Sequence, residues 1–124
     1  MSRKLLLDVD PGCDDAVMIS MALASPDVEV VGVTTVAGNS SVDNTTRNAL
    51  SVLELLGRTD VPVAQGARQP IVGDLTTAEW VHGENGIRGD MPEPTTRTVD
   101  ESAVGFMIDK AREHGSDLTV VSTG

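Results

Sequence analysis

Four aspartates stand within eight residues near the start of the chain, and no basic residue lies among them. They are Asp8, Asp10, Asp14 and Asp15. Two carboxylates about 4 Å apart repel each other by roughly 4 kcal/mol at an effective dielectric constant of 20, so a partly buried cluster favours a bound cation or proton. Oxygen ligands suit a hard ion, and calcium tolerates irregular carboxylate sites better than magnesium does. Either ion could hold and acidify a water molecule.

The residues between these aspartates can bring the carboxylates together. Pro11-Gly12 can turn the chain sharply, so that Asp10 at a strand end faces Asp14 and Asp15 at a helix start. The positive potential of a helix N-terminus favours the ionised carboxylates. In the alternative interpretation, Asp14 and Asp15 are only a cap and a first-turn acid, and residues 10–12 only form a turn.

Hydrophobic patterning predicts strands that alternate with helices around this motif. Strands are expected at residues 5–7, 28–35, 62–64 and 118–121, and helices at 15–24, with Asp14 as the N-cap, at 41–56 and at 102–114. The apolar residues of the first helix predict a helix that is buried on most sides. This alternation indicates an α/β fold with a mainly parallel open sheet and helices on both of its faces.

In such a sheet, ligands bind at the carboxyl ends of the strands. Residues 8–15, 36–39 and the segment from Gly66 onward all follow strands, so we expect them on one rim. The stretch 66–98 is long and rich in Gly, Pro, Asp and Thr, and segments of this kind are usually functional or disordered. His82 stands in this stretch and not on an apolar helical face, which leaves a functional role open.

The composition argues against several classes of partner. The chain has 9 basic and 19 acidic residues and a net charge of −10, so its surface would repel phosphate backbones and anionic lipids. We therefore expect no nucleic-acid or membrane partner. Cys13 is the only cysteine, which excludes an internal disulfide. The apolar run at residues 5–7 is too short for a signal peptide or a membrane span, so a cytoplasmic location is expected.

The segment Asp8-Val9-Asp10-Pro11-Gly12-Cys13-Asp14-Asp15 is similar to the signature of the inosine-uridine preferring nucleoside hydrolase family. Three later segments resemble family segments in the same order: residues 34–39, 44–49 and 82–86. The resemblance covers essentially all 124 residues. It implies a Rossmann-like nucleoside hydrolase fold, of which residues 1–124 form the N-terminal part of a single domain that is cut short after the fourth strand.

The same resemblance implies the reaction and the cofactor. Asp10 and Asp15 would coordinate Ca²⁺, and Asp10 would also take a proton from the water that attacks the anomeric carbon. The products would be a free purine or pyrimidine base and ribose, as in nucleoside salvage. A carboxylate-rich pocket suits the positive charge that develops on the sugar in such a reaction.

The resemblance also assigns the remaining residues of the site. The substrate-binding residues would be Asp14, which would hold a ribose hydroxyl, Asn39 and His82, and Asp8 would support the site from behind. The substrate would be a small ribonucleoside. Members of the family form dimers and tetramers, so a homo-oligomer is expected.

Two alternatives remain at this point. Family members run to about twice this length, and the resemblance places further ligands in their later portion. We therefore expect little activity from these 124 residues, and an inert or merely ribose-binding fragment is one alternative. The other is a magnesium-dependent phosphotransferase of the haloacid-dehalogenase type, because a buried strand ending in Asp8-Val9-Asp10 fits an aspartyl nucleophile. Pro11-Gly12 and the Asp14-Asp15 pair do not fit that motif.

Overall fold

The computed structural model, which describes residues 2–124, confirms the alternation of strands and helices. Four parallel strands form one sheet in the order β3-β2-β1-β4. The strands are β1 (Arg3–Val9), β2 (Val28–Thr35), β3 (Val63–Gln65) and β4 (Leu118–Ser122). The helices are α1 (Cys13–Ala24), α2 (Val42–Leu55), α3 (Glu79–His82), α4 (Ala103–His114) and the short 3₁₀ helix η1 (Gly115–Asp117).

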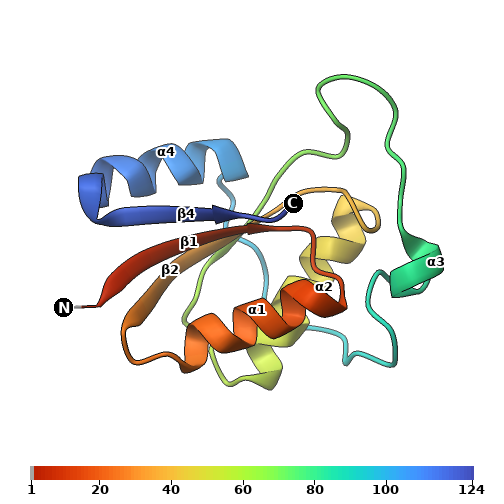
Figure 1. The fold of residues 1–124 in the computed structure, drawn as a ribbon, viewed down its shortest axis with the longest axis horizontal. Coiled ribbons are helices and arrows are strands. Elements are labelled where there is room, and N and C mark those ends of the chain that lie inside the picture. Colours follow the sequence, from red (N-terminus) through yellow and green to blue (C-terminus); the bar gives the residue numbers. More distant parts are fainter. Residues whose placement is uncertain (1) are drawn as a thin grey trace.

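Helices lie on both faces of the sheet, with α1 and α2 on one face and α4 on the other (Figure 1). This arrangement follows from right-handed crossovers, because the path from β1 to β3 runs in one direction and the return to β4 runs in the other. Alternate side chains of β1 pack against the helices on the two faces of the sheet. Leu7 and Val9 belong to the same core cluster as Ile19 of α1, whereas Leu6 packs with Phe106 of α4.

Helix α1 differs from the prediction in its start and in its burial. It begins at Cys13 with Gly12 at the N-cap position, so the prediction that Asp14 is the cap was wrong. The physical reason is that the turn at Pro11-Gly12 leads directly into the helix, and the free N–H of Cys13 is bound by His82 instead. Asp14 therefore falls inside the first helical turn and is exposed.

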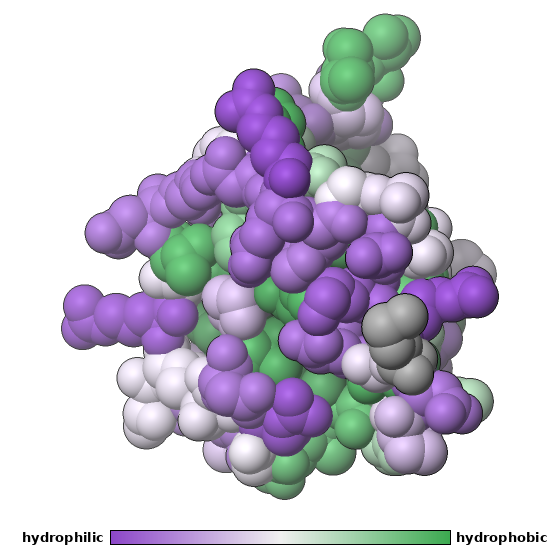
Figure 2. Space-filling model, turned by 90° about the vertical axis from the view of Figure 1, so that its left-hand side faces the viewer, coloured by the Kyte–Doolittle hydropathy of each residue, from purple (hydrophilic) through white to green (hydrophobic). Residues whose placement is uncertain are grey.

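The prediction that α1 is buried on most sides was also wrong. Only Asp15 and Ile19 are fully buried, while Val17 and Met21 are 59% and 69% exposed. One side of the helix packs on the sheet, and nothing else in residues 2–124 covers the opposite side. Apolar surface between hydrophilic side chains is also visible on the side of the molecule shown in Figure 2.

The long segment between β3 and α4 contains the short helix α3 and is tied to the body of the protein. Oε1 of Glu54 accepts hydrogen bonds from the backbone and the hydroxyl groups of Thr95 and Thr96, at 2.6 to 3.0 Å. Ser41 caps the start of α2, because its hydroxyl accepts the N–H of Asn44. No helix within the described residues is long and apolar enough to cross a membrane.

Candidate functional site

The loops after β1 and β2 are joined by a reciprocal pair of hydrogen bonds. The backbone N–H of Asn39 donates to Oδ2 of Asp10 at 2.8 Å, and the Asn39 amide Nδ2 donates to the carbonyl oxygen of Asp10 at 3.0 Å. Gly38 makes this approach possible, because a Cβ at that position would collide with the Asp10 carboxylate. The sheet thus places Asp10 and Asn39 together on the rim, as the sequence predicts.

Asp15 lies beside Asp10, and two donors hold its carboxylate. Oδ2 accepts the backbone N–H of Asp10 at 3.1 Å, and Oδ1 accepts the hydroxyl of Thr123 at 2.8 Å. Both aspartates are buried, with exposed fractions of 9% for Asp10 and 3% for Asp15. No ion pair to either carboxylate is found in residues 2–124. The two acidic side chains are therefore brought together without a compensating cation from the described chain.

This arrangement has an electrostatic consequence for Asp10. Burial raises the pKa of Asp10 from 3.8 to about 6, the hydrogen bond from Asn39 partly opposes this shift, and the Asp15 carboxylate raises the pKa further. A bound cation would relieve both the burial cost and the repulsion. The oxygen-only donors fit a hard ion such as calcium. Two carboxylates are nevertheless an incomplete set, since the described residues contain no group of three or more His, Cys, Asp or Glu side chains placed to hold a metal.

Asp8 lies two residues before Asp10, and its side chain forms hydrogen bonds with both neighbouring strands. Its Oδ1 accepts the hydroxyl of Thr34 at 2.6 Å, and its Oδ2 accepts the hydroxyl of Ser122 at 3.0 Å. Thr34 and Ser122 are also the register partners of Asp8 in β2 and β4. The carboxylate of Asp8 thus links three strands at their carboxyl ends, behind the Asp10 turn.

His82 approaches the same turn from the last residue of α3. Its Nδ1 accepts the backbone N–H of Cys13 at 3.3 Å, a contact that requires this nitrogen to be unprotonated. Gly12 leaves room for the ring, because a Cβ there would collide with it. Asp14 is the exception among the predicted site residues. It is exposed and lies along a groove with Val17 and Val121, outside the hydrogen-bonded network of Asp10.

Residues 5–124 match the family model described as inosine-uridine preferring nucleoside hydrolase. The chain belongs to this family. Its relatives include the pyrimidine-specific ribonucleoside hydrolase RihA of Escherichia coli O7:K1, which is 48% identical over 125 aligned residues. That alignment covers all of this chain and 40% of the relative, so the chain spans about two fifths of the relative's length.

Solved nucleoside hydrolase structures superpose closely on the chain. A purine-preferring ribonucleoside hydrolase from Gardnerella vaginalis has a TM-score of 0.93 and 39% identity, with coverage of 98% of this chain and 40% of that chain. A plant nucleoside hydrolase, PpNRh1, also has a TM-score of 0.93, at 38% identity, and covers 100% of this chain and 40% of its own. The predicted α/β nucleoside hydrolase fold is therefore confirmed, and the phosphotransferase alternative gains no support.

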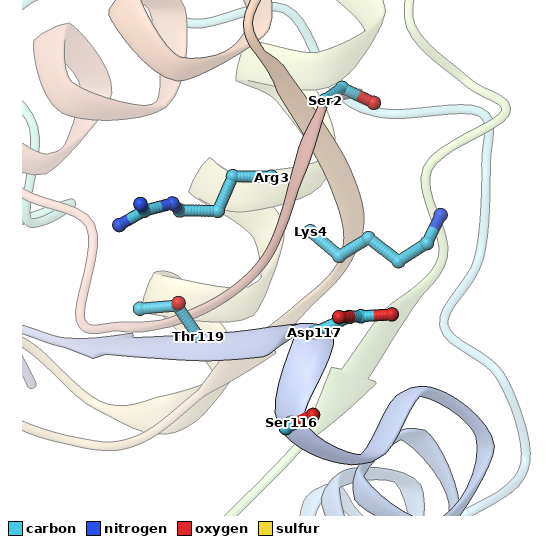
Figure 3. Close-up of a pocket in the computed structure, with 6 residues that line it drawn as sticks. All are labelled: Ser2, Arg3, Lys4, Ser116, Asp117 and Thr119. Carbon is cyan, nitrogen blue, oxygen red and sulfur yellow. The ribbon is translucent and has the colours of Figure 1, made fainter.

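A cavity of about 690 Å³ lies at the other edge of this nucleoside hydrolase sheet and is separate from the candidate site (Figure 3). It is lined by Ser2, Arg3, Lys4, Ser116, Asp117 and Thr119. These residues stand at the amino ends of β1 and β4, whereas Asp10 follows the carboxyl end of β1. The side chains of Arg3 and Lys4 point in opposite directions, so they do not converge on a common ligand (Figure 3).

Sequence reasoning missed three residues that hold the site together in this nucleoside hydrolase chain. They are Thr123, which bonds to Asp15, and Thr34 and Ser122, which bond to Asp8. A usable signal was present, because each of the three is a hydroxyl residue at or just after the carboxyl end of a strand that pairs with β1. In a parallel sheet, such residues share the rim with the acidic turn.

Proposed function

We propose that residues 1–124 form the N-terminal part of a single nucleoside hydrolase domain, which cleaves the N-glycosidic bond of purine or pyrimidine ribonucleosides with the help of Ca²⁺. One observation carries the proposal: Asp10 and Asp15 are buried side by side on the rim, without a compensating basic group in the described chain. The names of the relatives, which describe ribonucleoside hydrolases, support the same reaction class.

Asp10 and Asp15 are the residues that would hold the calcium ion. When bound, the ion would orient a water molecule and make it more acidic. Asp10 would accept a proton from that water at Oδ1, because Oδ2 already accepts the N–H of Asn39. Without a bound ion, burial and the Asp15 carboxylate raise the pKa of Asp10 to about 6, and a bound cation would lower it again. The two hydrogen bonds to Asp15 keep its carboxylate in place as the second ligand.

The substrate would lie over this rim. The exposed carboxylate of Asp14 would bind a ribose hydroxyl, and Asn39 and His82 would complete the chain's share of the pocket. Attack of water on the anomeric carbon builds positive charge on the sugar, which the fixed carboxylates would stabilise. The base preference is left open, since the relatives include both pyrimidine-specific and purine-preferring enzymes.

We expect the 124-residue chain by itself to bind calcium weakly and to turn over little substrate. Calcium prefers about six to eight oxygen ligands, and the described chain brings together two carboxylate residues. The same incomplete ligand set favours the second candidate, a chain that binds ribose without cleaving the nucleoside.

A calcium titration of the chain by isothermal calorimetry tests the proposal. The wild-type chain and Asp10→Asn are compared, with Asp117→Asn as the matched control because Asp117 lies at the opposite edge of the sheet. We expect the heat of binding to disappear in Asp10→Asn and to persist in Asp117→Asn. Equal calcium binding by all three chains would overturn the proposed metal site. Parallel incubation with inosine and uridine measures ribose release, and release of phosphate from a phosphate ester would instead favour the phosphotransferase.

A further inference from the structure

A buried amide on α2 connects two segments of the site that are far apart in sequence. Nδ2 of Asn48 donates one hydrogen bond to the carbonyl oxygen of Pro11 at 3.3 Å and another to the carbonyl oxygen of Asn85 at 2.8 Å. Pro11 directly follows Asp10, and Asn85 stands three residues after His82. Both N–H groups of one side-chain amide are thus used to join the aspartate turn to the His82 loop.

The position of Asn48 in α2 shows why this amide matters. Asn48 is only 1% exposed and directly precedes the core residue Ala49. Burying an amide without partners costs about 1–3 kcal/mol, and the two hydrogen bonds of Asn48 offset this cost. The two carbonyl groups need donors for the same reason. Gly86, with a φ of 80°, lets the loop turn tightly against Asn48.

The direct contact between the two segments is weaker than the contact through Asn48. The N–H of Cys13 meets Nδ1 of His82 at 3.3 Å in an exposed environment, whereas the bond of the same length from Asn48 to Pro11 is buried. A hydrogen bond in contact with water contributes little on its own, whereas a buried one is costly to break. Asn48 therefore supplies the buried hydrogen bond from α2 to the aspartate turn and a second bond to the His82 loop.

We propose that Asn48 is a positioning residue, which fixes His82 relative to Asp10 and Asp15 by holding their two backbone segments together. In this proposal it acts through the carbonyl oxygens of Pro11 and Asn85 and not as a ligand of metal or substrate. The value of this arrangement for catalysis rests on the proposed function. The positional claim itself concerns only the described chain and can be tested without metal or substrate.

The test compares Asn48→Ala with Ser51→Ala. Ser51 lies one turn further along α2, is also 1% exposed, and donates its hydroxyl to the carbonyl of Pro92 at 2.8 Å. Both substitutions therefore remove a part-buried hydrogen bond between α2 and the same long loop. Only Asn48→Ala also removes a bond to the aspartate turn. Loss of stability alone affects both variants, so a difference at the site reports on positioning.

The first readout is the hydrogen-exchange rate of the Cys13 backbone amide. NMR measures this rate under conditions in which both variants are folded. In Asn48→Ala we expect the Cys13 amide to exchange about tenfold faster than in Ser51→Ala, which corresponds to about 1.4 kcal/mol of lost local protection. The second readout is the fluorescence anisotropy of Trp80, the only tryptophan, which lies two residues before His82. The anisotropy should fall in Asn48→Ala and remain near the wild-type value in Ser51→Ala.

Equal exchange at Cys13 and equal anisotropy in the two variants would overturn the positioning role. If Asn48→Ala does not fold, Asn48→Ser takes its place, because it keeps a polar group at the site but lacks the reach of the amide, and the Cys13 amide should again exchange faster than in Ser51→Ala. Calcium titration of the same variants separates the two proposals. Absence of calcium binding to the wild-type chain would count against the proposed function, while the exchange rates would still decide the role of Asn48.

Discussion

The hydroxyl of Thr123 lies 2.8 Å from Oδ1 of Asp15, although 108 positions separate the two residues. The backbone N–H of Thr123 also donates to the carbonyl oxygen of Asp8 at 2.9 Å. These two hydrogen bonds join the residue after β4 to Asp8 of β1 and to the Asp15 carboxylate. This contact makes β4 part of the candidate metal site and not only an additional strand.

Thr123→Val should weaken calcium binding without unfolding the chain. The substitution preserves the shape of the side chain and removes the donor that orients Asp15, and loss of a group that orients a metal ligand typically costs about 10–100-fold in affinity. Calorimetric titration with calcium measures the effect. Thr119→Val is the control, because Thr119 is exposed in β4, which Thr123 directly follows, and lines the cavity at the opposite edge. Indistinguishable affinities for the two variants would show that Thr123 does not orient Asp15.

Asp10→Asn should stabilise the chain in the absence of metal. At neutral pH the wild-type chain must bury an ionised Asp10 next to Asp15, whereas an asparagine can still accept the N–H of Asn39 and can donate toward Asp15. From the pKa of about 6, we expect a gain of about 1–3 kcal/mol. Thermal unfolding in EDTA measures it. A lower melting temperature for the variant would contradict the electrostatic picture of the site.

The stability difference between wild type and Asp10→Asn should depend on pH. Because the folded-state pKa of Asp10 is raised from 3.8 to about 6, the folded chain holds the proton more tightly than the unfolded chain does. The proton on Asp10 therefore stabilises the folded wild-type chain. This stabilisation is complete below about pH 4 and is lost as the pH rises through 6. The two melting temperatures should therefore be similar near pH 4 and furthest apart above pH 7. A constant difference from pH 4 to pH 8 would be inconsistent with titration of Asp10 in this range.

The rim positions of Asp10 and Asn39 were accessible from the sequence, because each follows a β-branched or aliphatic run that is typical of a buried parallel strand. Strand ends of one parallel sheet share an edge, so the pairing of these residues needs no knowledge of side-chain contacts. The burial that raises the pKa of Asp10 was not accessible in this way, since it depends on Gly38, Asn39 and Asp15 closing around one carboxylate.

Asn48 illustrates what local sequence cannot reveal. Within α2 it reads as an ordinary polar residue beside Ala49, and its two partners are 37 residues away on either side. The prediction of a helix boundary at Asp14 was wrong for a related reason. An aspartate before an apolar helix favours the N-cap position, but a contact from His82, 69 residues further on, accepts the first free N–H instead. Both features are decided by tertiary contacts.

The exposed side of α1 leads to a final prediction about stability. Ile19 is 0% exposed and lies in the main core cluster, so Ile19→Ala should cost about 2–5 kcal/mol. Met21 on the same helix is 69% exposed, and Met21→Ala should change stability by about 0.5 kcal/mol or less. Urea unfolding of the two variants measures both values, provided that the unfolding free energy depends on urea concentration with the same slope in each.

The two substitutions remove side chains of similar size from one helix, so helix propensity cannot explain a large difference between them. A comparable cost for Met21→Ala would mean that the side chain is covered in solution, either by a second copy of the chain or by another polypeptide. Repeating the unfolding at several protein concentrations distinguishes these outcomes, because the stability of a self-associated chain rises with concentration and that of a monomer does not.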